Sequence, residues 1–158
     1  MIRRLCALLV LLAPAPVLAQ SALCSFTSTP GAAFGPYDDA LATPTDTSTS
    51  VVVNCLRNGG PANVTVTLQL GPSAGSGQIA NRAMRAGAES LAYNLYRDAG
   101  RSLVWGQTAG VDAGTLGING IPNNGSKNGT FVIYGRIPAQ QSVGAGAYTD
   151  SVQITVSP

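Results

Sequence analysis

The side chains able to do chemistry in this 158-residue chain are few, and their types exclude several classes of reaction. No histidine is present, so a serine or cysteine nucleophile of the common hydrolase kind would lack its base. Cysteines without histidine are also too few here to complete a zinc shell. Asp38 and Asp39 are adjacent, which is typical of a solvated turn because neighbouring side chains point apart. The sequence therefore predicts no enzyme, no metal and no cofactor.

The first residues have the features of a secretory signal peptide. Arg3 and Arg4 precede an apolar run at residues 5–12, and residues 17–19 form a small-residue cleavage signal. The apolar run is too short to span a bilayer. We therefore predict a signal peptide at residues 1–19 and a single exported domain at residues 20–158, without membrane insertion after cleavage.

Cys24 and Cys55 remain after cleavage, whereas Cys6 is removed with the signal. An even number of cysteines in an oxidising compartment favours a disulfide. The alternative is a pair of buried free thiols.

Charge gives little indication of a partner. Without Arg3 and Arg4, seven of the nine Lys and Arg residues remain, and they equal the seven Asp and Glu residues in number. A neutral domain favours neither nucleic acid nor an anionic membrane as a partner.

The rest of the exported part consists of short β-rich runs separated by Gly, Pro, Asn, Ser and Thr. This pattern is typical of a sandwich or barrel, whose strands would position the side chains named above. The predicted strands are residues 24–28, 50–56, 63–70, 78–84, 91–97, 103–105, 130–136 and 148–156. Residues 82–90 are alanine-rich and predict a helical turn. Trp105, the single tryptophan, is expected in the core rather than as a sugar-stacking surface.

The last predicted strand alternates with period two. Its apolar face carries four residues: Tyr148, Val152, Ile154 and Val156. The opposite face carries Thr149, Ser151, Gln153 and Thr155. One face is therefore expected to be buried, and the far edge of the strand needs a partner.

Four separated blocks resemble one known family. They are LAYNLYRD at residues 91–98, VWG at 104–106, VIYGRIP at 132–138 and GAYTDSVQITV at 146–156. Their order and spacing, together with Cys24 and Cys55, resemble the spore coat protein U domain family over almost the whole exported part. That family includes subunits of archaic chaperone-usher pili.

The resemblance implies an all-β, immunoglobulin-like (pilin-type) sandwich that lacks its final strand. A periplasmic chaperone, and then a neighbouring pilin subunit delivered at an usher, would fill the groove by strand addition. The groove edge would be residues 148–156, with Tyr148, Val152, Ile154 and Val156 facing inward. The opposite edge would come from the first strand, around Cys24 and Phe26. The implied location is the periplasm and then the cell surface of a Gram-negative-type bacterium.

One departure from the family suggests a terminal position. Predicted cleavage leaves only residues 20–23 before Cys24, about 13 Å of extended chain, whereas a groove along residues 148–156 runs about 30 Å. We therefore expect either a tip or cap subunit that accepts a donor strand without supplying one, or a non-pilus coat domain that shares the fold. The alternatives are a tip adhesin that binds a surface or glycan through residues 71–77 or 119–128, and a secreted hydrolase.

Overall fold

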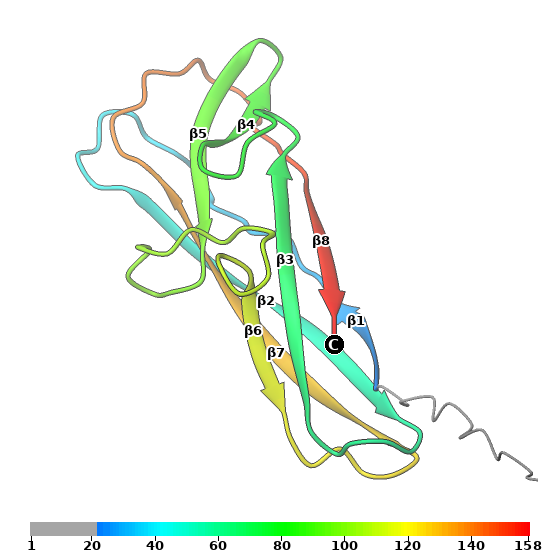
Figure 1. Ribbon diagram of the computed structural model, residues 1–158. Coiled ribbons are helices and arrows are strands. Elements are labelled where there is room, and N and C mark those ends of the chain that lie inside the picture. Colours follow the sequence, from blue (N-terminus) through cyan, green and yellow to red (C-terminus); the bar gives the residue numbers. More distant parts are fainter. Residues whose placement is uncertain (1–21) are drawn as a thin grey trace, which may run out of the picture.

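The computed structural model describes residues 22–158, and every regular element among them is a β-strand (Figure 1). The strands are β1 (Leu23–Ser28), β2 (Thr45–Arg57), β3 (Val64–Ser73), β4 (Arg82–Ala86), β5 (Glu89–Tyr96), β6 (Gly114–Ile118), β7 (Gly125–Ile137) and β8 (Val152–Ser157). The predicted signal peptide lies outside the described residues. Within that described part, no helix is long and apolar enough to cross a membrane.

The strands form two antiparallel sheets. One has the order β1-β2-β7-β5-β4 and the other has the order β6-β3-β8. Figure 1 shows β3 and β8 crossing over β2 and β7 as a second layer. The expected all-β sandwich is therefore confirmed.

Inward-facing residues of both sheets form one core, as the period-two patterns predict. From β2, β3 and β7 the buried residues are Val51, Val53, Cys55, Val66, Leu68, Leu70, Phe131, Ile133 and Ile137. Trp105 is 2% exposed and donates a hydrogen bond from Nε1 to the Leu68 carbonyl at 2.9 Å. Its ring lies so close to Gly114 that an added Cβ there would approach the indole to 2.2 Å. Trp105 is thus a core residue, and it requires glycine opposite it.

The region after β3 differs from the sequence prediction. The helical turn predicted for residues 82–90 is wrong, because β4 and β5 form a hairpin in which Ala86 pairs with Glu89. Gly87 turns the chain with a φ of 60°. Alanine favours helix only weakly, and pairing with a neighbouring strand overrides that preference. The strand expected at residues 78–84 accordingly starts later, at Arg82.

Several further strand assignments change. Residues 103–105 form only an isolated bridge, between Val104 and Tyr96, and β6 was not predicted at all. The last strand begins at Val152, while Thr149 bridges Arg85 of β4. β2 extends back to Thr45, because its polar first half pairs with β7 along a full register from Thr45 to Arg57.

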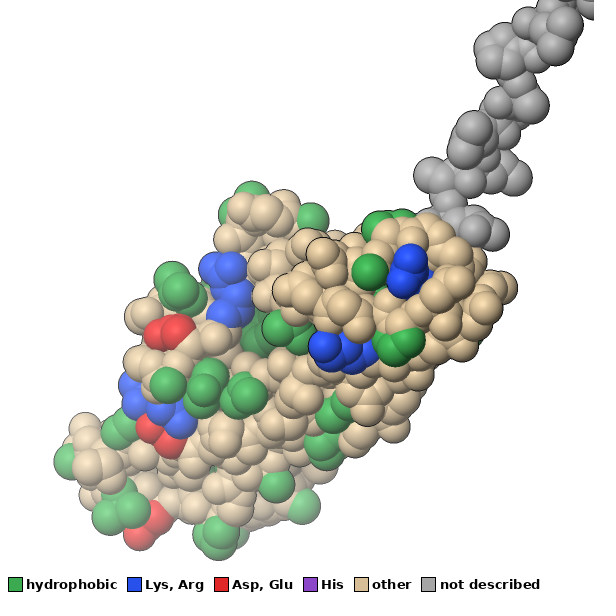
Figure 2. Space-filling model, turned by 90° about the horizontal axis from the view of Figure 1, so that it is seen from below, with side chains coloured by type: hydrophobic (Ala, Val, Ile, Leu, Met, Phe, Trp, Pro, Cys, Tyr) green, Lys and Arg blue, Asp and Glu red, His purple; other side chains and the backbone are tan. Residues whose placement is uncertain are grey.

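One ion-paired cluster lies on the surface, around Asp46. Asp46 accepts two hydrogen bonds from Arg136, at 2.7 and 2.8 Å, and lies 3.2 Å from Arg101. The hydrogen bond from Arg136 holds the pKa of Asp46 below its ordinary value. Figure 2 shows basic and acidic side chains side by side on one part of the face seen from below, with hydrophobic side chains in small separate groups.

Candidate functional site: an open groove beside β8

Two edge strands meet at one margin of the sandwich. β8 pairs with β3, and β1 pairs with β2, and neither has a strand on its other side within residues 22–158. Figure 1 shows the two lying alongside each other, although they belong to different sheets. Their outward N–H and C=O groups are therefore free to pair with an added strand.

A groove opens where the chain leaves β1. It consists of two adjoining hollows of about 500 Å³ and about 600 Å³, which share Ala32, Phe34, Met84 and Tyr148. Residues 29–39 form one wall, and residues 143–154 form the other. The apolar floor of the smaller hollow comes from both sheets and includes Val51, Leu70, Leu95 and Ile133. The groove thus reaches the core of the sandwich.

The structure places the predicted groove residues in two groups. Tyr148, Val152 and Ile154 line the smaller hollow. Phe26 and Val156 pack against the core but do not line either hollow. The exposure pattern of β8 alternates as expected, with Gln153 and Thr155 exposed and Ile154 half-buried. The wall opposite β8 is the irregular chain after β1 rather than Cys24 and Phe26.

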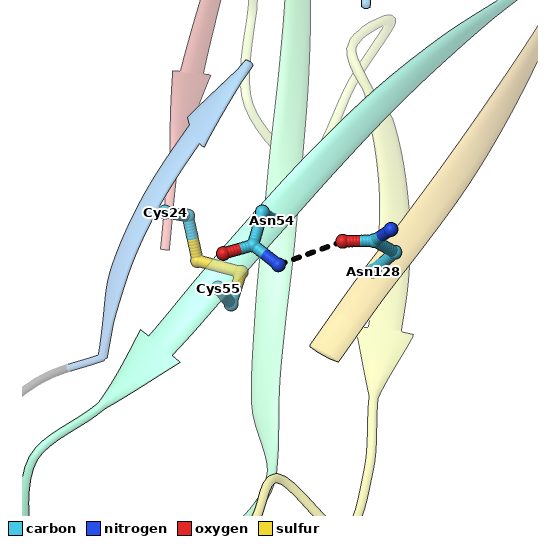
Figure 3. The surroundings of a disulfide bond; sticks show 4 residues. All are labelled: Cys24, Asn54, Cys55 and Asn128. Atoms are coloured by element: carbon cyan, nitrogen blue, oxygen red, sulfur yellow. Dashed lines mark hydrogen bonds between the residues drawn. A yellow bond between two sulfur atoms is a disulfide. The ribbon is translucent and has the colours of Figure 1, made fainter. Parts of the chain in front are cut away.

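Cys24 and Cys55 form a disulfide with an S–S distance of 1.99 Å (Figure 3). The two residues are directly opposite each other in the β1 to β2 pairing, and Cys55 is fully buried. On the other side of β2, Asn54 donates a side-chain hydrogen bond to Asn128 at 2.7 Å. The disulfide therefore attaches the edge strand β1 covalently to its neighbour β2.

Residues 29–39 were missed as part of the site. They form no strand, and side chains hold them: Thr47 Oγ1 donates to the Ala33 carbonyl at 2.7 Å, and Thr49 Oγ1 donates to the Pro30 carbonyl at 3.2 Å. Phe34 packs edge-on against Tyr93, with ring centroids 5.7 Å apart. An irregular segment has no periodicity to reveal its burial, so the only signal was the large apolar side chain of Phe34 among small residues, glycine and proline.

Asp150 is a second residue that the sequence reasoning missed. Its Oδ2 accepts a hydrogen bond from the Tyr93 hydroxyl at 2.6 Å, and its Oδ1 accepts one from the Gly75 N–H at 2.9 Å. Burial raises the pKa of the Tyr93 phenol, and the hydrogen bond to Asp150 raises it further, so the hydroxyl keeps its proton and donates. The sequence does contain a signal for Asp150, because period-two alternation places it on the apolar face midway between Tyr148 and Val152.

Arg82 supports the groove from beneath and is fully buried. Its guanidinium donates to four acceptors: Asn94 Oδ1 (2.8 Å) and the carbonyls of Gly71 (2.8 Å), Trp105 (2.8 Å) and Leu70 (3.2 Å). Burial lowers the pKa of Arg82, and the carboxylates of Asp150 and Asp112 oppose that shift. One side chain therefore joins β3, β4, β5 and the Trp105 segment behind the groove.

No group of three metal-binding side chains of the His, Cys, Asp or Glu type occurs among the residues that the structure describes. The site is instead a groove between residues 29–39 and the chain leading into the free edge of β8, with an apolar floor in its smaller hollow. Residues 10–155 match the Spore Coat Protein U domain family.

The chain belongs to the Spore Coat Protein U domain family. A curated relative is Protein U of Myxococcus xanthus, which is 35% identical over 99 residues, covering 61% of this chain and 51% of that protein. The match thus spans about half the length of the relative. Membership of the family therefore rests on the match over residues 10–155.

Solved structures give the fold of this Spore Coat Protein U domain. One is the CsuC-CsuE complex of chaperone and tip adhesion subunit from the archaic chaperone-usher Csu pili of Acinetobacter baumannii. It matches with a TM-score of 0.53 and 19% identity, and the match covers 85% of this chain and 39% of that chain. The P pilus rod subunit PapA matches with a TM-score of 0.53 and 16% identity, covering 85% of this chain and 97% of PapA. The domain is therefore a pilin-like β-sandwich.

Proposed function

We propose that the protein is an exported structural subunit of a chaperone-usher-type pilus or surface coat, and that it accepts an extended strand from another chain along β8. The observation that carries the proposal is the free edge of β8 beside an open groove. An added strand would pair with the outward backbone groups of β8 and cover Val152 and Ile154 with its own apolar side chains. The role is structural and involves no catalysis.

The partners that we propose are those that the family implies. An unpaired apolar edge aggregates unless it is covered, so a periplasmic chaperone would occupy the groove before a neighbouring subunit does, and an usher would mediate the exchange. Membership of the Spore Coat Protein U domain family supports this role, as does the likeness to a pilus subunit solved with its chaperone. Export through a signal peptide at residues 1–19 would bring residues 20–158 to the periplasm, where the disulfide forms.

Ile154→Asp should abolish capture of the chaperone. Ile154 lines the groove, and covering a carboxylate there without a partner costs about 3 kcal/mol or more, roughly a 100-fold loss of affinity. Gln153→Asp places the same charge on the exposed face of β8 and should change affinity little. Copurification from the periplasm with a coexpressed chaperone measures both variants.

The milder Ile154→Thr variant and a thermal melt of each free protein separate loss of capture from loss of folding. A stable Ile154→Asp protein that retains its chaperone, or equal losses from both aspartates, would contradict the proposed role of β8.

We also propose a terminal position, as the tip or a cap. Cleavage after Ala19 would leave residues 20–23 ahead of Cys24, too few to span a groove along residues 148–156. Expressed with a chaperone and neighbouring subunits, the protein should enter fibres only at one end, as electron microscopy with labelled subunits would reveal. Fibres built from this subunit alone, through its own amino terminus, would rule out the terminal position.

A further inference from the structure

The groove edge contains one charged residue in an otherwise apolar row. Asp150 stands on the inward face between Tyr148 and Val152, and all three line the smaller hollow. It is half-buried, and its carboxylate points inward to Tyr93 rather than out to solvent. A strand added along β8 that continues past Val152 toward Tyr148 would therefore meet a carboxylate in the otherwise apolar row.

The Asp150 carboxylate has acceptor positions that no donor of the described residues occupies. A carboxylate has about four acceptor positions, and Tyr93 and Gly75 occupy one on each oxygen. No Lys or Arg nitrogen of residues 22–158 lies within salt-bridge distance of Asp150. Arg82, the buried cation nearby, donates instead to Asn94 and to three backbone carbonyls. The carboxylate can thus accept a further hydrogen bond from a donor on the groove side.

An added strand would cover the unoccupied acceptor positions of Asp150. Side chains directly opposite on neighbouring antiparallel strands have Cβ atoms about 4.5 to 5.5 Å apart, so one inward residue of the added strand would lie over Asp150. An apolar side chain there would remove water from the carboxylate and offer nothing in return, which is costly. A side chain that donates a hydrogen bond would replace the lost water, most strongly if it is cationic.

We propose that the groove selects a strand whose apolar alternation is interrupted, opposite Asp150, by a hydrogen-bond donor side chain, with lysine or arginine preferred. This inference rests on the proposed function and adds the chemistry of the partner strand. Asp150 is then a specificity residue of the groove, while Val152 and Ile154 supply the apolar contact. The same feature disfavours uniformly apolar strands, which are the ones that promote aggregation.

Synthetic strands test this with the full exported protein. Two labelled 13-residue peptides carry alternating valine and threonine and differ only at the central inward position, which is lysine in one and leucine in the other. The lysine peptide should bind the wild-type protein about tenfold more tightly, as fluorescence anisotropy would measure. In Asp150→Asn, which keeps an acceptor for Tyr93 but removes the charge, the preference should fall to about twofold or less.

Ser151→Asn is the matched control, because Ser151 is the exposed neighbour of Asp150. It should retain the tenfold preference for lysine. Equal binding of the two peptides, tighter binding of the leucine peptide, or a preference that persists in Asp150→Asn would overturn the inference while leaving strand acceptance intact. Failure of both peptides to bind the wild-type protein would overturn the proposed function and this inference together.

Discussion

Replacing Arg82 by methionine should lower the free energy of unfolding by roughly 3 to 5 kcal/mol. The methionine fills a similar volume, but the buried carbonyls of Gly71, Trp105 and Leu70 lose the guanidinium that they accept from. Each buried acceptor left without a partner costs about 1 to 3 kcal/mol, and relief from burying a charge offsets part of the sum. Urea unfolding followed by tryptophan fluorescence measures the effect, since Trp105 lies beside the site.

A neighbouring arginine provides the control for that experiment. Arg85 lies on the same strand, is exposed and donates to the Gly75 carbonyl at 2.9 Å. Arg85→Met should change stability by about 1 kcal/mol or less. Similar losses from Arg82→Met and Arg85→Met would show that the buried hydrogen bonds are not what stabilises this part of the sandwich.

Replacing both Cys24 and Cys55 by alanine should cost about 3 to 4 kcal/mol. The disulfide spans a sequence separation of 31 residues, and opening a loop of that length restores chain entropy to the unfolded state. The six-residue β1 pairs only with β2, and besides that pairing it is held by the packing of Cys24 and Phe26 against the core. Denaturant unfolding with matched protein concentrations measures the difference.

A reducing agent gives an independent check on the disulfide. Dithiothreitol should lower the stability of the wild-type protein to about that of the double alanine variant and should leave the variant unchanged. If reduction destabilises both proteins equally, the loss comes from elsewhere than the bond between Cys24 and Cys55.

Strands with clear alternation were predictable, and those shaped by tertiary contacts were not. β8 has apolar residues at every second position, and its inward face follows from sequence alone. β6 contains Gly114 and Gly117 among five residues, which suggests a loop, yet Gly114 is required by the approach of Trp105. Residues 82–90, which hold β4 and the turn into β5, were assigned as a helical turn, because local alanine content says nothing of a neighbouring strand.

The groove was predictable on one side only. Tyr148, Val152 and Ile154 were identified because they repeat with period two. The opposite wall has no repeat, and its burial depends on Phe34 meeting Tyr93, which lies far away in the sequence. The importance of Asp150 likewise depends on Tyr93, 57 residues away, and on Gly75, 75 residues away. These contacts between distant residues exist only after folding, so no local sequence pattern predicts them.

The disulfide also determines how the sandwich would carry mechanical load. A pulling force on the chain ahead of Cys24 passes through covalent bonds to Cys55, so the weakly attached β1 is bypassed. β2 then bears the tension, and it is paired with β7 along all 13 of its residues. Rupture under force depends on the barrier to unfolding rather than on equilibrium stability. Force applied at Cys24 would thus enter one of the two longest strands of the domain.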